Sequence, residues 1–217
     1  MTPLSAAEDV EGLWLATLQR ALGRASHDVR DALNGVSVNL EVVRGRAARP
    51  DARADAVAPY ADAAAHQLDR LTSLMEAVLA LGRAERHPVD VAVTLRRLAI
   101  VCSASTSGSD AAVVVDMGNV ESAVTNVRGD AVRLALAAPL LELVQGGGQT
   151  ERATPVRCTV AEEEGATVVT LAAEGRRAVM PERVADAVRA AGVRWSGDGQ
   201  GATEVGRDDL SLVFPRA

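Results

Sequence analysis

Hydrophobic residues recur with a seven-residue period through the first third of the chain. The period is carried by Leu15, Leu22, Val29, Val36 and Val43, and it is supplemented by Leu18, Ala25, Leu33 and Leu40. This mixture of three- and four-residue spacings predicts one long helix that packs along its length. The segment RGRAARPDAR that follows has a proline and no apolar pattern. It predicts a connection near residues 44–53.

A second apolar stripe predicts a second long helix, which ends before Pro88 because proline cannot continue a helix. The stripe consists of Ala61, Leu68, Met75, Val78 and Leu79. Two helices joined by a short loop form an antiparallel hairpin, which cannot bury both stripes by itself. A four-helix bundle made with a second copy of the chain solves this problem, so the sequence predicts a homodimer.

From about residue 89 the pattern changes to short alternating segments. Helices are expected at VTLRRLAIVC, DAVRLALAAPLLELVQ and PERVADAVRAAG, and strands at AAVVVDM, SAVTNV, PVRCTVAEE, ATVVTLAAEG and DLSLVFP. This order predicts an α/β sandwich with helices on one face of a mixed or antiparallel sheet. The overall fold class is therefore α+β, with a helical hairpin at residues 1–87 and a sandwich at residues 88–217.

Composition and charge exclude several classes of function. Only 2% of residues are aromatic, the formal net charge is −6, and arginines are dispersed among acidic residues, so nucleic acid is not an expected partner. No basic segment precedes a long apolar run at the start, and no window is long enough to span a membrane, so a cytoplasmic location is expected. Cys102 and Cys158 lack metal-ligand spacing and are interpreted as buried apolar residues.

One face of the first helix carries an unusual set of polar groups, within RASHDVRDALNGV. At about 100° per residue, with Val29 at zero, His27, Asp31 and Asn34 lie near 160°, 200° and 140°, opposite the apolar seam. Asp28 and Arg30 flank them. Such a set is either an ordinary solvated face or a nucleophilic site, in which a carboxylate orients an imidazole that takes up a phosphoryl group.

The segment HDVRDALN resembles the phospho-acceptor motif of the histidine kinase dimerisation domain, usually written H-(E/D)-x-R-x-P-L. The resemblance implies that His27 is the phosphorylated residue and that Asp28 is its acidic neighbour; Arg30 and Leu33 also match. Two positions depart from the pattern. Ala32 replaces the usual proline, and Asp31 stands where a Thr or Asn commonly supports phosphatase activity, which puts dephosphorylation of a partner in doubt.

The second half is similar to a kinase ATP-binding domain that has lost its nucleotide site. GDAVRLALAAPLLELVQ matches the family's helix at Asp130, Arg133 and Leu134, but no asparagine is present for magnesium and Glu142 is the single acidic candidate. In the segment usually written D-x-G-x-G-I-x-x-E, Glu174 replaces the aspartate and Arg177 replaces the second glycine. The fold implied is a degenerate ATP-binding domain, for which we expect no bound cofactor.

The resulting interpretation is a histidine phosphotransferase that relays phosphate between receiver domains of response regulators through His27. Mg²⁺ is expected on the partner receiver and not on this chain, and the degenerate domain would be a docking surface. Two alternatives stay open. One is a divergent ATP-dependent kinase that binds nucleotide through Glu142 and Glu174, and the other is a non-catalytic pseudokinase scaffold that binds a regulator.

Other candidate sites have weaker support. His66 and His87 lie in and after the second helix and are interpreted as solvated or capping residues. The glycine-rich segment WSGDGQGATEV lacks the GxxxxGK[ST] pattern of a phosphate loop and is expected to be a turn. No G-x-S-x-G elbow, H-E-x-x-H motif or paired-carboxylate site is present.

Overall fold

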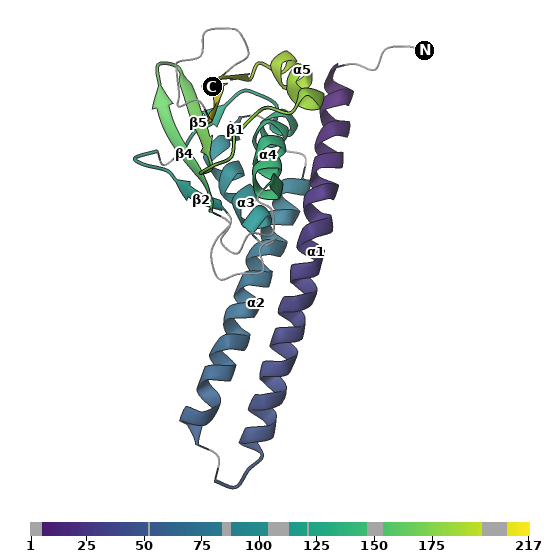
Figure 1. The fold of residues 1–217 in the computed structure, drawn as a ribbon, viewed down its shortest axis with the longest axis vertical. Helices are drawn as coiled ribbons and strands as arrows, with labels where there is room; N and C mark the ends of the chain where they lie inside the picture. The colour runs from purple at the N-terminus through teal and green to yellow at the C-terminus, as the bar shows by residue number, and fades with distance from the viewer. Residues whose placement is uncertain are drawn as a thin grey trace.

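A long helical hairpin packs with its upper half against an α/β unit (Figure 1). The computed structural model describes residues 6–51, 53–83, 88–103, 113–120, 122–146, 154–196 and 208–217. The hairpin consists of α1 (Ala6–Ala47) and α2 (Ala54–Gly82). The α/β unit, by which we mean the described residues from Pro88 onward, contains α3 (Val91–Ser103), α4 (Gly129–Gly146) and α5 (Glu182–Ala190).

The α/β unit contains one mixed sheet of five strands in the order β2-β4-β5-β7-β6. β2 pairs with β4 in parallel and every other pair in this sheet is antiparallel. The strands are β2 (Val113–Asp116), β4 (Val156–Glu163), β5 (Ala166–Ala172), β6 (Arg194–Trp195) and β7 (Leu210–Pro215). The expected mixed α+β class is thus observed.

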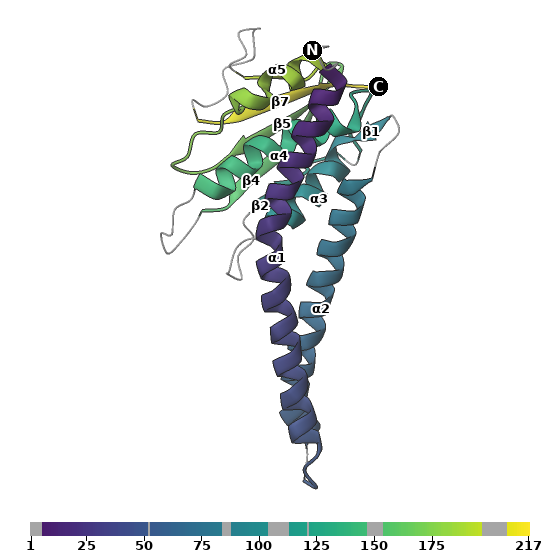
Figure 2. The ribbon, with the colours of Figure 1, turned by 90° about the vertical axis from the view of Figure 1, so that its right-hand side faces the viewer.

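The helices cover one face of this sheet, and α1 lies outside them as a third layer (Figures 1 and 2). Alternate strand residues point toward the helices, as in the buried row of Cys158, Leu171 and Leu210 across three neighbouring strands. Both cysteines are buried, as expected from the sequence, and burial raises the pKa of the Cys158 thiol to about 12.

Two predicted boundaries differ from the observed ones. The first helix continues to Ala47, into the predicted connection. In its last turn Arg46 donates a hydrogen bond to the carbonyl oxygen of Ala56, and its guanidinium lies 4.6 Å from the centroid of the Tyr60 ring. The predicted strand SAVTNV is reduced to β3 (Val124–Thr125), which pairs with β1 (Val89–Asp90) in a separate two-stranded sheet.

The buried stripe of α1 is rotated from the predicted seam. Val36 is buried, but Leu33 and Leu40 are each 50% exposed, and so is Leu15. The upper half of α1 buries Leu18 and Ala25 of the predicted seam together with Val10, Trp14 and Ala21, which the seam did not include. The reason for the shift in the upper half is tertiary, because α1 packs there on α3 and α4 as well as on the end of α2.

A common core joins the hairpin to the α/β unit. Trp14 and Leu18 of α1 lie against Leu81 of α2, Leu98 of α3 and Leu141 of α4, around a cavity of only about 10 Å³. The buried Arg133 donates a hydrogen bond of 2.8 Å to the carbonyl oxygen of Leu81, and its guanidinium lies over the Trp14 ring. Among the described residues, no helix combines the length and apolar character needed to cross a membrane.

Candidate functional site

His27 lies on the exposed side of α1, just below the part of the helix that packs on the α/β unit. Ala25, two residues earlier, is buried in the common core. At about 100° per residue, His27 lies on the opposite side of α1 from both Ala25 and Val36, and its side chain is exposed. The imidazole is therefore open to a partner protein.

Asp31 and Asn34 are exposed on the same face as His27, one and two turns further along α1. Arg30 is also exposed, at the side of this face. Helical spacing alone brings these groups together, so their positions agree with the arrangement expected from the sequence. The roles of all four residues remain predictions.

Asp28 differs from its neighbours because it turns toward α2. Its carboxylate is half-buried, and its Oδ2 atom is buried with no hydrogen-bond partner among the described residues. Burial raises the pKa of Asp28 above its usual value, the charge of Arg70 on α2 lowers it, and Asp31 and His27 exert smaller opposing effects. The result is a partly desolvated carboxylate beside the imidazole.

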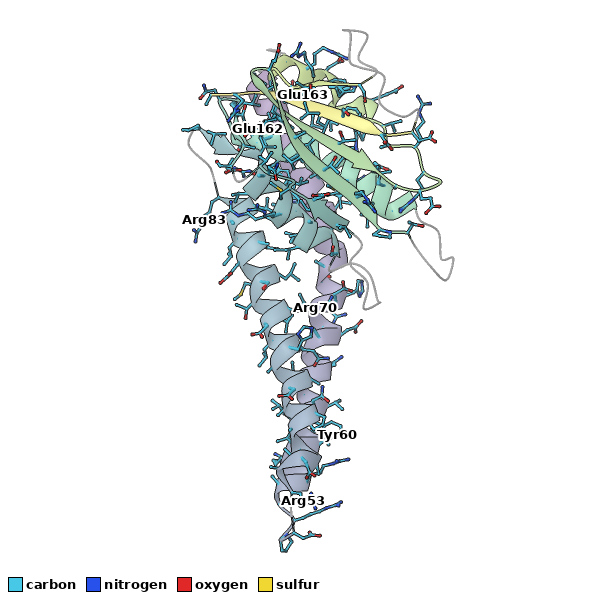
Figure 3. The ribbon with its side chains drawn as sticks, turned by 90° about the vertical axis from the view of Figure 1, so that its left-hand side faces the viewer. Arg53, Tyr60, Arg70, Arg83, Glu162 and Glu163 are labelled. Atoms are coloured by element: carbon cyan, nitrogen blue, oxygen red, sulfur yellow. The ribbon has the colours of Figure 1, made fainter. Side chains whose placement is uncertain are left out.

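Arg70 was not singled out by the sequence analysis. It lies on α2, below the α/β unit (Figure 3), and acts on Asp28 across the hairpin. Nothing in the sequence spacing pairs residue 70 with residue 28, because the match depends on the register of the two antiparallel helices. That register is marked elsewhere by the contact of Asn39 with Gln67.

Arginine side chains surround Glu142, the residue that the sequence suggested as a metal ligand. Oε1 of Glu142 on α4 accepts hydrogen bonds from Arg20 of α1 at 3.1 Å and from Arg183 of α5 at 3.2 Å. Arg176 donates to the carbonyl oxygens of Leu143 and Thr154. The single carboxylate that the sequence offered for a metal is therefore engaged by two cations.

The other residues of this region offer little for nucleotide. Glu174 and Arg177 are both exposed, and Gly175 has a positive φ of 69° in the turn after β5. Among the described residues, no group of three or more His, Cys, Asp or Glu side chains is arranged to hold a metal ion. His66 is exposed on α2, whereas His87 and most of WSGDGQGATEV lie outside the described residues.

No protein-family model and no curated protein sequence matches the chain. Among solved structures, it is similar to a histidine kinase of Acinetobacter baumannii at 11% identity and a TM-score of 0.35, covering 87% of this chain and 97% of that chain. The histidine kinase domain of a blue-light-activated kinase from Erythrobacter litoralis matches at 16% identity and a TM-score of 0.40, covering 83% and 94%.

A bacterial phosphotransferase matches at 15% identity and a TM-score of 0.39, over 98% of each chain. All of these TM-scores lie below 0.5. We draw no conclusion about activity from them, and the candidate site rests on the residues of this chain.

Proposed function

We propose that this chain is a histidine phosphotransferase that relays a phosphoryl group between receiver domains of response regulators through His27. The observation that carries the proposal is the exposed imidazole of His27 next to the half-buried carboxylate of Asp28, within a segment that resembles a phospho-acceptor motif. Exposure is necessary because the aspartyl phosphate of another protein has to reach the ring nitrogen.

The chemistry needs one nitrogen of His27 in its unprotonated form. The lone pair of that nitrogen attacks the phosphorus of the receiver's aspartyl phosphate, a P–N bond forms, and the P–O bond to the aspartate breaks. The bonding pair returns to the receiver's carboxylate, while the second ring nitrogen keeps its proton. The same steps in reverse deliver the phosphoryl group to a second receiver, and the Mg²⁺ belongs to the receivers.

Asp28 would orient the imidazole and favour the cationic ring that forms during transfer, because a partly desolvated carboxylate interacts strongly with a neighbouring positive charge. Asp31, Asn34 and Arg30 would contact the receiver at the rim of the site. The roles of Asp31 and Asn34 follow from their places on the face of His27, and that of Arg30 from its place at the side of this face.

The proposal includes transfer without ATP. Its support is the pairing of Glu142 with Arg20 and Arg183, which leaves this carboxylate neutralised beside two positive charges that repel a metal ion. The exposed Arg177 occupies the position at which kinase ATP-binding domains have a glycine that lets nucleotide approach closely. A divergent kinase that uses Glu142 would first have to break both ion pairs.

We also propose that the hairpin forms a homodimeric four-helix bundle. Exposed apolar side chains follow both helices, at Leu15, Leu33 and Leu40 on α1 and at Leu68, Met75 and Leu79 on α2. On each helix this stripe lies about 80–120° from the buried stripe, in the same rotational sense. Because the helices are antiparallel, both stripes reach the same side of the hairpin, where a second copy can cover them.

The proposed function is tested by phosphoryl transfer to the protein and to its variant His27→Ala. The protein is incubated with radiolabelled ATP, and separately with a receiver domain phosphorylated on its aspartate, and acid-labile, base-stable label on the chain is measured. We expect label from the receiver and not from ATP. His27→Ala should lose that label while its unfolding free energy stays within about 0.5 kcal/mol of wild type, since the side chain is exposed.

Other results select other functions. Persistence of receiver-derived label in His27→Ala would contradict the assignment of the nucleophile. Label from ATP would indicate a divergent kinase, and binding of a receiver with no label from either source would indicate a scaffold.

A further inference from the structure

Three elements meet at one carboxylate on the side of the molecule that carries His27. Arg20 of α1 and Arg183 of α5 share Oε1 of Glu142 on α4, at 3.1 Å and 3.2 Å. The side chains of Arg20 and Arg183 are 32% and 51% exposed, so both guanidinium groups reach solvent. We call this cluster of Arg20, Glu142 and Arg183 the basic rim.

Arg20 of the basic rim and His27 lie on the same face of α1. Arg20 and His27 are seven residues apart, which is two helical turns. At about 1.5 Å and 100° per residue, they differ by about 10 Å along the helix axis and about 20° around it. A partner that reaches His27 along this face therefore meets the ends of α4 and α5 next to it.

The size of a protein interface places the basic rim inside the footprint of such a partner. A stable interface buries about 800 Å² on each side, which corresponds to a disc of radius about 16 Å. Arg20, at about 10 Å, falls within a disc centred on His27, and Glu142 and Arg183 are hydrogen-bonded neighbours of that same face.

The charge of the basic rim is opposite to that of the proposed partner. Two guanidinium groups against one carboxylate leave a net charge of about +1 in a chain whose formal net charge is −6. The shared carboxylate oxygen accepts from one terminal nitrogen of each arginine, so although Nε of Arg20 is buried, terminal N–H groups remain on both guanidinium groups for further acceptors. The proposed partner should be acidic at this point, because the Mg²⁺ expected beside its phosphorylated aspartate needs carboxylate oxygens as ligands.

We propose that Arg20 and Arg183, held in place by Glu142, contact the acidic rim of the receiver's phosphorylation site while His27 reacts. This inference rests on the proposed function and extends it to a second element of recognition, contributed by the α/β unit. Arg20 and Arg183 are recognition residues and not catalytic ones, because they contact the surface of the partner and do not contact the transferred phosphoryl group. Glu142 pre-organises them, which lowers the entropy lost when the receiver docks.

The test is the rate of phosphoryl transfer from a phosphorylated receiver to the full chain, measured against receiver concentration and ionic strength. We expect Arg20→Ala and Arg183→Ala each to raise KM by about three- to tenfold and to weaken its salt dependence, with kcat at saturating receiver changed by less than about twofold. Arg20→Lys keeps the charge and should retain most of the affinity.

A matched control separates recognition from structure. Arg216 pairs with Glu162 at 3.0 Å with a similar exposure of 43%, at the end of β7. Arg216→Ala loses a comparable ion pair and should leave both KM and its salt dependence unchanged. A merely structural role for the basic rim would change the unfolding free energy in all three alanine variants alike and would leave KM alone.

The outcomes distinguish this inference from the proposed function. Suppose that the wild-type protein is labelled at His27, but that Arg20→Ala and Arg183→Ala both show wild-type KM and salt dependence. The role of the basic rim in recognition is then overturned, and the proposed phosphotransferase function stands. If wild type takes no label from the receiver, both proposals fall together.

Discussion

At the scale of single residues, Gly35 of α1 leaves room for the side chain of Gln67 on α2. A Cβ atom at this position would lie 2.4 Å from Nε2 of Gln67, whose Oε1 accepts a hydrogen bond of 3.5 Å from Asn39. Gly12 also lies within α1, but a Cβ atom there would meet nothing within 4 Å. The two glycines have the same helical setting and differ only in what faces them.

These two positions allow a paired stability measurement. Alanine is favoured over glycine in a helix by about 1 kcal/mol, so Gly12→Ala should raise the unfolding free energy by about that amount. In Gly35→Ala the same gain is offset by displacement of the flexible Gln67 amide and loss of one long hydrogen bond, worth about 1 kcal/mol or less. We expect a net change near zero in urea unfolding, and a loss above about 1 kcal/mol would show that Gln67 cannot move.

At the scale of elements, α1 is one continuous helix with two different partners. Its lower half packs on α2, while its upper half is buried against α3 and α4 of the α/β unit and the end of α2. Trp14 is the largest side chain in this contact and lies under the guanidinium of Arg133. The upper half of α1 therefore holds the α/β unit onto the hairpin.

Removal of the Trp14 side chain should strongly lower the unfolding free energy. We expect Trp14→Ala to lower the unfolding free energy by about 3–5 kcal/mol, because a buried aromatic ring is lost and Arg133 loses its contact with the indole. Circular dichroism during urea unfolding measures the change. The exposed Gln19 on the same helix is the control, and Gln19→Ala should stay within about 0.5 kcal/mol of wild type. A cost below about 1 kcal/mol for Trp14→Ala would contradict the packing.

At the scale of the whole molecule, the exposed apolar stripes on one side of the hairpin are the feature that the single chain leaves uncovered. We expect Leu40→Lys and Leu68→Lys each to shift the protein from dimer to monomer, because a charge in the centre of the bundle would be desolvated. Light scattering after size exclusion gives the mass.

Val38 provides the control for this dimer measurement. It is 59% exposed and lies on α1 near the polar face of His27, away from the apolar stripes. Val38→Lys should leave the dimer intact, whereas a monomer in this variant would place the interface on the other side of the hairpin. A monomeric wild-type protein would contradict the proposed homodimeric four-helix bundle.

Periodicity was sufficient for the hairpin and for most of the sheet, because those elements are recognisable over many residues. It placed His27, Asp31 and Asn34 on one face of a helix, where the structure also has them. It failed for β1 and β6, which are two residues long and depend on pairing with distant segments, and it predicted β3 as part of a longer strand. It did not separate Leu33, which is exposed in the single chain, from the buried Val36, since the buried sector of α1 depends on what packs against it.

The sequence by itself determined which residues share a helical face and which groups there can do chemistry, because helix geometry is local and repeats every few residues. Only the tertiary structure brought Arg70 to Asp28, and Arg20 and Arg183 to Glu142, since these contacts join residues 42, 122 and 41 positions apart. The register of the helices and the packing of the layers determine which of these residues meet, and the periodicity within a single element predicts neither.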